Sequence, residues 1–587
     1  MTSIPDQLSA TFGGAFAALD LPADLGQVKE SDRPELADYQ CNGAMAAAKA
    51  AKKAPRAVAE AIVEHLKTAA PDLEIEIAGP GFMNIRLTPA FYATRANEIA
   101  ADPRAGAGKV ATPRTVMMDY GGPNVAKPMH VGHLRSSVIG DSLSRLFRFR
   151  GDQVISDIHL GDWGLQMGHL VTELQDEQPD LPYFDANFTG PYPSEAPVDI
   201  EDLARLYPQA SAKAKSDEAR MARSRAATAE LQAGRPGYRA LLRHFIEVSI
   251  AALKRDFGDL GVSFDLWKGE SDVHDRIAPM VERFKAEGVT IQSDGAWIIP
   301  VAREDDKKEL PPLILISSQG SALYATTDLA TIEDRKVEQN PDLTLYVVDL
   351  GQSDHFEQVF RAAYKAGLGQ EGAFEHIKFG TVNGPDGKRL RTRDGGTFRL
   401  ADLIREARER AAARIDEAGL GAELSAEDKA EVARLVANAA IRFSDLSNYR
   451  TTNYIFDLER FISFEGKTGP YLLYQAVRVK SLMRKAKEKG LEPGAIQITA
   501  PEEAALVRRL DGFDGALQRA YDLRAPNHIC EHAFALAQAF SSFYAACPIL
   551  PEGDDAVRAS RLALAKAMLD QLTLALSLIG MDIPERM

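Results

Sequence analysis

MMDYGGPNVAKPMHVGHLR, residues 117–135, is the stretch that decides how the central part of the chain folds. Residues 115–120 are mostly apolar and the glycines and proline at 121–123 end this run, which indicates a buried strand followed by a turn. Apolar residues then recur at helical spacing, at Leu134, Val138, Ile139, Leu143, Leu146 and Phe147. The predicted helix stops at Gly151, and residues 154–158 indicate a second strand. The stretch is therefore one βαβ unit with its loop at the carboxyl end of a strand, where open parallel sheets bind ligands.

Two histidines flank a glycine at the mouth of the predicted helix, in the order His130, Val131, Gly132, His133. The free N–H groups and positive end of a helix favour a polyphosphate there. Gly132 lets the backbone come close to a ligand, and two imidazoles can donate hydrogen bonds to phosphoryl oxygens as charge develops on them. The alternative, a pair of surface histidines beside a tight turn, is equally compatible with these four residues alone.

The longer stretch from Pro123 to Ser136 resembles the signature loop of class I aminoacyl-tRNA synthetases, and its full form is similar to that of arginyl-tRNA synthetases. Residues 156–164, SDIHLGDWG, resemble the same family. The resemblance covers nearly the whole chain. It implies an α/β Rossmann-type parallel-sheet catalytic domain with a helical insertion, a small α+β N-terminal domain and an all-α C-terminal anticodon-binding domain.

Composition excludes some classes of protein. The 587 residues are 45% hydrophobic and 26% charged, and no run of about 18 apolar residues would span a membrane. Residues 1–21 lack the basic segment and continuous apolar run of a signal peptide, and three widely spaced cysteines suggest neither disulfides nor a zinc site, so we expect a cytoplasmic protein. A net charge of −15 argues against a protein that binds nucleic acid over most of its surface, but it is compatible with a local basic surface. We expect no DNA or membrane partner.

The pattern of elements divides the chain into three predicted domains. Residues 1–110 form an α+β domain, 111–400 the catalytic domain with a helical insertion at about 176–275, and 401–587 a helical domain whose part from about 465 resembles the anticodon-binding domain. After the insertion, apolar runs at 295–301, 313–317 and 343–349 are strand candidates with which the α/β pattern returns. The resemblance implies that the first domain contacts the tRNA elbow and the insertion holds the acceptor end. The charged run from Lys213 to Arg225 is as compatible with a solvated helix face.

An acidic pocket is predicted at the carboxyl edge of the sheet. Tyr324 and Asp328 are four apart and share a helix face, and Asp119 and Gln352 each follow a strand. A guanidinium needs carboxylates and amide oxygens around it and an aromatic ring to stack on. The resemblance implies that Tyr324, Asp328 and Gln352 hold the arginine side chain while Asp119 and Asn124 contact the amino-acid end. Taken singly, each residue is also compatible with a cap, core or turn role.

A second ATP-binding element is predicted at residues 384–396, GPDGKRLRTRDGG, which follow a strand expected at 379–382. The cations of this loop that we assign to ATP are Lys388, Arg389 and Arg393. Thr392 stands where the family's loop carries its second lysine, and Lys127 resembles the family's substitute for that cation. A hairpin tip is the structural alternative.

Three side chains are candidate RNA contacts, because exposed aromatic and guanidinium groups can stack on splayed bases. They are Tyr471, Tyr474 and Arg478. Each aromatic ring is equally compatible with a place in the core of the helical domain.

The resemblance thus implies a ligase that joins L-arginine to tRNA(Arg) through an arginyl-adenylate. His130, His133 and Lys127 are the predicted catalytic residues, ATP is accompanied by Mg²⁺, and no protein ligand to a metal is identified. The resemblance also implies a monomer that needs bound tRNA for the first step. The alternatives are another class I synthetase or nucleotidyltransferase, and a catalytically silent tRNA-binding relative that would have lost the histidines or Lys127.

Overall fold

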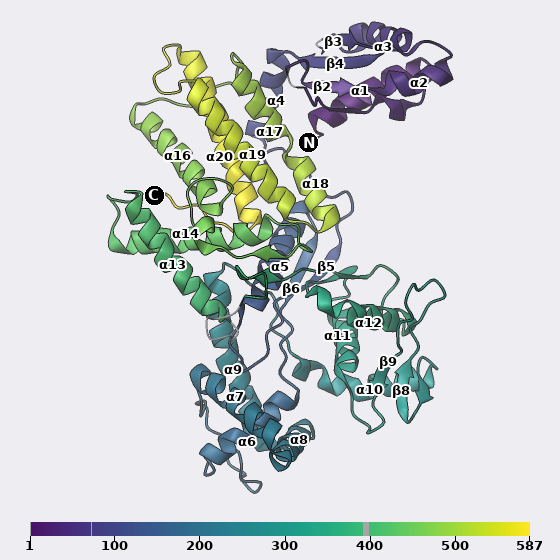
Figure 1. Cartoon of the computed structure of the whole chain (residues 1–587), viewed down its shortest axis with the longest axis vertical. Helices are drawn as coiled ribbons and strands as arrows, with labels where there is room; N and C mark the ends of the chain where they lie inside the picture. The colour runs from purple at the N-terminus through teal and green to yellow at the C-terminus, as the bar shows by residue number, and fades with distance from the viewer. Residues whose placement is uncertain (1, 34, 72, 391–397) are drawn as a thin grey trace.

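A four-stranded parallel sheet lies at the centre of the computed structural model, which describes residues 2–33, 35–71, 73–390 and 398–587 (Figure 1). The strand order is β11-β10-β5-β6. The strands are β5 (Thr115–Asp119), β6 (Gln153–Asp157), β10 (Leu343–Tyr346) and β11 (Phe374–His376). In this register Asp119 pairs with Asp157 on one side and with Tyr346 on the other, so these side chains share the carboxyl edge of the sheet. The predicted fold class is confirmed.

Helix α5 (Val131–Arg150) connects β5 to β6 and lies largely buried. It begins directly after His130, two residues before the predicted start, and ends at Gly151, whose φ of +110° suits a residue without a side chain. The predicted βαβ unit is therefore present, with its histidines on the first turn of the helix.

The apolar runs at 295–301 and 313–317 do form strands, but not in the parallel sheet. They belong to a separate antiparallel sheet, β7-β8-β9, which has its own hydrophobic core with three helices. The elements are β7 (Ile291–Ser293), β8 (Ala296–Ile299), β9 (Leu313–Ile316), α10 (His274–Ala286), α11 (Tyr324–Glu338) and α12 (Ser353–Lys365). Strands of four residues carry too little periodicity to reveal which sheet they join.

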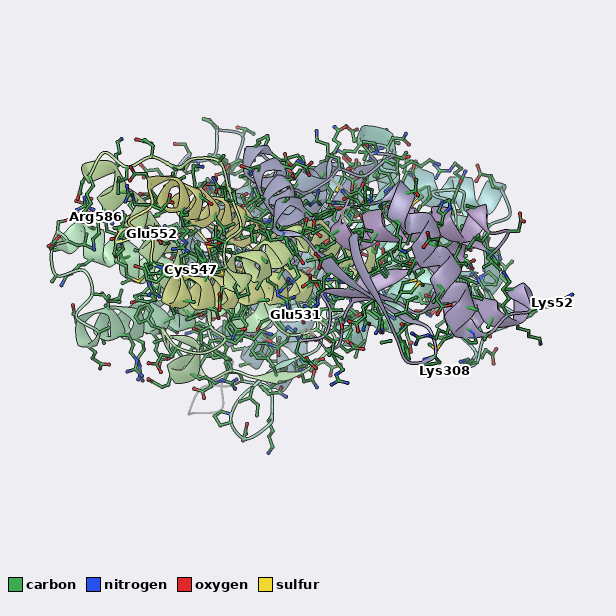
Figure 2. The ribbon with its side chains drawn as sticks, turned by 90° about the horizontal axis from the view of Figure 1, so that it is seen from above. Lys52, Lys308, Glu531, Cys547, Glu552 and Arg586 are labelled. Atoms are coloured by element: carbon green, nitrogen blue, oxygen red, sulfur yellow. The ribbon has the colours of Figure 1, made fainter. Side chains whose placement is uncertain are left out.

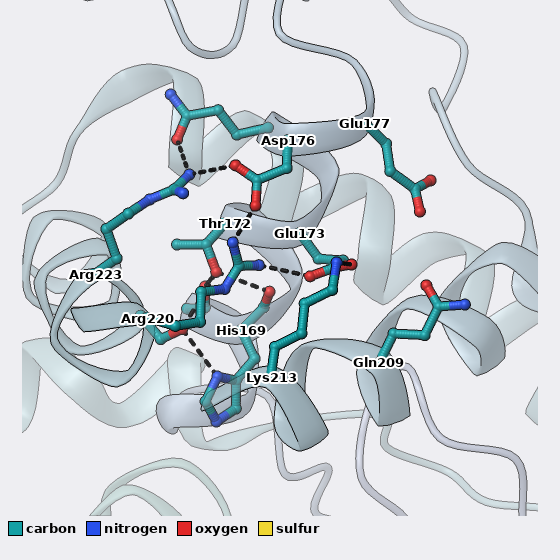
Figure 3. Close-up of polar contacts among 12 residues, drawn as sticks. His169, Thr172, Glu173, Asp176, Glu177, Gln209, Lys213, Arg220 and Arg223 are labelled. Atoms are coloured by element: carbon teal, nitrogen blue, oxygen red, sulfur yellow. Dashed lines mark hydrogen bonds and ion pairs between the residues drawn. The ribbon is translucent and has the colours of Figure 1, made fainter. Parts of the chain in front are cut away.

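The insertion consists of four helices, α6 (Leu165–Glu177), α7 (Ile200–Ser216), α8 (Glu218–Gln232) and α9 (Pro236–Asp259). A buried ion-pair cluster joins the first three, because Glu173 of α6 is fully buried and pairs with Lys213 of α7 and Arg220 of α8 (Figure 3). Arg220 and Arg223 also pair with Asp176. Several charges of the 213–225 run therefore bind the helices together, so the run is not simply a solvated helix face.

The N-terminal unit is a four-stranded antiparallel sheet of order β1-β2-β4-β3 covered by helices. Its elements are α1 (Ile4–Ala18), η1 (Ala23–Gly26), β1 (Val28–Glu30), β2 (Tyr39–Cys41), α2 (Gly43–Ala51), α3 (Pro55–Ala69), β3 (Leu73–Ala78), β4 (Phe82–Leu87) and α4 (Pro89–Ala101). Asp511 of the C-terminal helices anchors it, accepting hydrogen bonds from the backbone of Ile4 (2.8 Å) and from Arg95 (2.6 Å). In the view of Figure 2, Lys52 and Arg586 lie at opposite ends of the molecule.

The chain beyond residue 400 is helical and packs on the catalytic sheet's α5. Its helices are α13 (Leu400–Glu417), α14 (Ala426–Leu446), α15 (Leu458–Phe461), α16 (Gly469–Glu488), α17 (Pro501–Asp511), α18 (Phe513–Leu523), α19 (Asn527–Ala546) and α20 (Asp555–Leu578). The strand predicted at 379–382 is reduced to β12 (Val382–Asn383), which pairs with β13 (Tyr454–Ile455). Across the described ranges no helix is long and apolar enough to cross a bilayer, and all three cysteines are buried free thiols.

Candidate active site

The two signature histidines stack on each other at the mouth of α5. Their ring centroids are 4.0 Å apart with the planes 29° from parallel. The backbone N–H of Gly132 donates to Nδ1 of His130 (3.0 Å), and the backbone N–H of His130 donates to Nδ1 of His133 (3.1 Å). Because each Nδ1 accepts, the proton of each neutral ring belongs on Nε2, which can donate to a ligand.

Both histidines are held in the neutral form. Burial lowers the pKa of His133 to about 3, assisted by the neighbouring His130. Burial also lowers the pKa of His130, and the ammonium of Lys127 contributes in the same direction. A neutral pair of Nε2–H donors can bind phosphoryl oxygens without itself exchanging a proton with them.

A cavity of about 290 Å³ opens beside this pair. It lies between the start of α5 and the segment at 379–390, and its lining includes His130, Gly132, Asp349 and Arg389. The Arg389 guanidinium is 3.5 Å from Asp349, and Lys388 is exposed at the turn before it. Arg393 lies outside the described residues. The structure therefore brings Arg389 to the histidine pair and leaves Lys388 at the rim.

Lys127 lies within electrostatic range of His130. Its ammonium lies 4.3 Å from the ring centre of Tyr207, which is on α7 of the insertion. Tyr207 has no counterpart among the predicted site residues, because an aromatic residue in a polar helix gives no sequence signal of such a contact.

The signature loop is fixed by backbone pairing with residues 158–161. Asn124 forms a parallel bridge with Gly161, and the N–H of Val125 donates to the Gly161 carbonyl at 3.0 Å. A Cβ on Gly161 would lie 2.4 Å from the side-chain oxygen of Asn124, so a larger residue there would displace the Asn124 side chain from its present position. Asn124 is half-buried at the edge of the sheet.

Asp119 is buried and paired. Its Oδ2 accepts from Nη2 of Arg335 at 2.7 Å, and the same nitrogen donates to Oδ2 of Asp157 at 2.7 Å. Burial raises the pKa of the Asp119 carboxyl, while the Arg335 guanidinium and His159 oppose that rise. Arg335, on α11, was not a predicted site residue, because a single arginine on an amphipathic helix usually indicates solvent exposure.

Helix α11 also carries Tyr324 and Asp328 at the predicted spacing. Asp328 is half-buried and lies 2.7 Å from Nε2 of His355, and this contact raises the pKa of that histidine. Tyr324 starts the helix with 73% of its surface exposed, so it is neither a core aromatic nor a cap. Gln352 is exposed at the end of the short helix η3 (Leu350–Gln352) and contacts none of the other four predicted arginine-site residues.

Glu270 adds a carboxylate that the sequence reasoning missed. It starts the short helix η2 (Glu270–Val273), and burial raises its pKa to about 7. His159 opposes that rise, whereas Asp162 and Asp328 add to it, so Glu270 lies within electrostatic range of Asp328. A glutamate between glycine and serine in a loop gives no periodic signal by which it could have been found.

The candidate RNA contacts lie on α16, facing α19. The guanidinium of Arg478 is 4.1 Å from the ring centre of Tyr544, and the ring of Tyr471 lies 5.7 Å from that of Phe534. Tyr474 is 37% exposed. Tyr471 is half-buried. Of the two predicted tyrosines, Tyr474 is therefore at the surface, whereas Tyr471 mainly packs against its neighbours.

Three family models match this chain. One described as tRNA synthetases class I (R), catalytic domain, covers residues 97–458, the DALR anticodon binding domain covers 472–587, and the arginyl tRNA synthetase N terminal domain covers 3–87. A parallel sheet with paired histidines at the mouth of its first crossover helix, followed by such a helical domain, defines a class I aminoacyl-tRNA synthetase.

Full-length relatives make the assignment more specific. The chain is 68% identical over 588 residues to arginine–tRNA ligase of Maricaulis maris and 60% identical over 589 residues to that of Hyphomonas neptunium, with 100% of each chain covered in both cases. The chain belongs to the arginyl-tRNA synthetase family. Its fold matches solved arginyl-tRNA synthetases of Plasmodium falciparum (TM-score 0.79) and Thermus thermophilus (TM-score 0.78), each 23% identical with both chains fully covered.

Proposed function

We propose that this chain ligates L-arginine to tRNA(Arg), consuming ATP and releasing AMP and pyrophosphate. The observation that carries the proposal is a stacked, neutral histidine pair at a helix mouth together with a group of carboxylates, Asp119, Asp328 and Glu270, that lie within electrostatic range of one another or of Tyr346. The first element suits a triphosphate and the second suits a cationic amino acid.

Two displacements make up the reaction. The arginine carboxylate, already ionised, attacks the α-phosphorus of ATP in line, and the bond to pyrophosphate breaks to leave arginyl-adenylate. The 2′-hydroxyl of the terminal adenosine then attacks the carbonyl carbon of the adenylate, loses its proton, and AMP departs. No general base is required for the first step, so catalysis there consists of positioning and charge stabilisation.

The histidine pair and the neighbouring cations take the phosphate-binding roles in this proposal. The Nε2–H groups of His130 and His133 donate to phosphoryl oxygens, Gly132 lets the triphosphate approach the helix, and Lys127 with Arg389 neutralises charge from opposite sides. Lys388 and Arg393 supply further cations from the 384–396 loop. Mg²⁺ would accompany ATP on its phosphate oxygens; among the described residues no group of three His, Cys, Asp or Glu could hold a metal ion, so no residue is assigned to it.

The amino acid is held at its two ends. Asp328 and Glu270 accept hydrogen bonds from the guanidinium, which Tyr324 and Gln352 cover from the rim. The hydroxyl oxygen of Tyr324 would lie 3.9 Å from a Cβ built on Gly164, so this ring reaches toward the start of α6. Asp119 and Asn124 contact the α-ammonium group.

The RNA-binding roles of the other units complete the proposal. The insertion holds the acceptor end, residues 1–110 contact the tRNA elbow, and the helices from about 465 bind the anticodon through Tyr474, Arg478 and the less exposed Tyr471. The chain acts as a cytoplasmic monomer, and bound tRNA is required before adenylate forms.

ATP–pyrophosphate exchange with each amino acid in turn, with and without bulk tRNA, tests the proposal. We expect exchange with arginine alone, only when tRNA is present, and loss of that exchange in Asp328→Ala. The matched control is Asp354→Ala, because Asp354 lies on the neighbouring α12 with its side chain 72% exposed and pairs only with Lys308 among the described residues. Exchange with another amino acid would overturn the substrate. Absence of exchange in the wild type under every condition would favour a silent tRNA-binding relative.

A further inference from the structure

Arg335 carries a buried guanidinium that contacts Asp119, one of the residues predicted to bind the amino acid. Only 4% of its side chain is exposed, and its Nη2 lies 2.7 Å from one carboxylate oxygen of Asp119 and 2.7 Å from one of Asp157. These carboxylates end the neighbouring strands β5 and β6, whereas Arg335 reaches them from α11. One nitrogen therefore joins both strand ends to the helix that also carries Asp328.

Asp119 keeps one oxygen available on its other side. Its Oδ2 is occupied by Arg335, and its Oδ1 accepts no hydrogen bond from any residue of the described ranges. The hydrogen bond from Arg335 holds Oδ2 and restricts rotation of the carboxylate, which limits the directions that Oδ1 can take.

The carboxylates of Asp119 and Asp157 carry more negative charge than the guanidinium of Arg335 neutralises. Two carboxylates and one guanidinium leave one net negative charge in a site where Asp119 is 8% exposed and Asp157 is 1% exposed. The other titratable groups around Asp119 are His159 on the loop after β6 and Tyr346 on β10. One ammonium group of a ligand would bring the cluster to neutrality.

We propose that Arg335 is a positioning residue that presents Oδ1 of Asp119 to the α-ammonium group of arginine. The inference rests on the proposed role of Asp119 and extends it, because it makes recognition of the α-amino group depend on a residue that does not touch the substrate. Arg335 opposes two changes that would weaken this recognition: rotation of Asp119 toward Asp157, and protonation of Asp119 in its buried position.

A comparison of two ligands on the full-length enzyme tests the proposal. Arginine and desamino-arginine, which has hydrogen in place of the α-ammonium group, differ only at the end that Asp119 is proposed to bind. In Arg335→Met we expect the KM for arginine in aminoacylation to rise about tenfold or more. The inhibition constant of desamino-arginine and the KM for ATP should stay within about twofold of the wild-type values. In Arg335→Lys, whose ammonium can still bind one carboxylate, we expect an intermediate KM for arginine.

Each other outcome has a distinct meaning. A parallel weakening of both ligands in Arg335→Met or in Arg335→Lys would show a merely structural role and overturn the proposal. The lysine variant retains the buried positive charge and so provides the test if the methionine variant does not fold. If the wild type binds desamino-arginine as tightly as arginine, the proposed role of Asp119 itself fails, which the variants alone would not reveal.

Discussion

The ammonium of Lys127 lies 4.3 Å from the ring centre of Tyr207, so the predicted ATP-binding cation rests on a helix of the insertion. We expect Tyr207→Leu to raise the KM for ATP by about 2- to 30-fold, because a cation over an aromatic face is stabilised by ~0.5–2 kcal/mol. Tyr207→Phe keeps the ring and should retain most of the affinity. Steady-state pyrophosphate exchange measures both.

A double variant shows whether the effect passes through Lys127. If it does, Lys127→Ala combined with Tyr207→Leu should be no weaker for ATP than Lys127→Ala alone. Additive losses would instead mean that Tyr207 acts on ATP or on the insertion independently of Lys127.

Glu270 predicts a pH dependence of arginine binding. Its pKa, raised by burial to about 7, means that the carboxylate a guanidinium needs is only partly formed at neutral pH. The KM for arginine should therefore fall as the pH rises through 7, and arginine binding below that pH should displace a proton. Measuring KM for arginine and for ATP over this range checks it, since the KM for ATP should not follow the same curve.

Glu270→Gln provides the comparison for that titration. The variant should have a higher KM for arginine at high pH and lack the change near pH 7. An unchanged profile in this variant would assign the titration to another group of the pocket, with His159, Asp162 and Asp328 as the groups that face Glu270.

Two reciprocal ion pairs hold the signature helix α5 against α14. Arg135 of α5 lies 3.1 Å from Asp445 of α14, and Arg442 of α14 pairs with Asp141 of α5. Asp445→Ala would leave the guanidinium of Arg135, which is 1% exposed, buried without its counter-charge. We expect a loss of about 3–5 kcal/mol in the free energy of unfolding, measured by chemical denaturation.

The exposed pair of Arg405 with Asp402 on α13 is the control for this loss. Its side chains are 63% and 49% exposed, so Asp402→Ala should change the free energy of unfolding by less than ~1 kcal/mol. Equal effects of the two substitutions would show that burial of the Arg135–Asp445 pair adds nothing to its contribution to the free energy of unfolding.

The sequence predicted those parts of the fold in which local pattern and tertiary role coincide. Helix α5 and strands β5 and β6 are long enough to show their periodicity, and Gly151 marks the helix end. The runs at 295–301 and 313–317 were assigned to strands correctly, but nothing in them tells a parallel from an antiparallel partner.

The candidate site likewise contains residues that the sequence predicted and residues that it did not. The predicted residues lie in motifs that are continuous in sequence, as in 123–136, or on one helix face, as with Tyr324 and Asp328. The unpredicted ones, Arg335, Glu270 and Tyr207, act through contacts between elements far apart in the chain. Such contacts depend on packing, which hydrophobic periodicity does not encode.

Gly140 sets how closely α5 can lie against the end of β5. A Cβ at this position would be 2.2 Å from the ring of Tyr120, which is 1% exposed and directly follows Asp119. Gly140→Ala should therefore lower the free energy of unfolding by about 1–3 kcal/mol and raise the KM for arginine, because the buried ring can move only together with the strand end.

Gly14→Ala on α1 is the matched control. Nothing lies within 4 Å of its added Cβ, so there the same change should stabilise by ~0.5–1 kcal/mol and leave the kinetics unchanged. Thermal unfolding and aminoacylation of both variants measure the contrast, and a Gly140→Ala enzyme with wild-type stability and KM would show that the contact between α5 and Tyr120 is not tight.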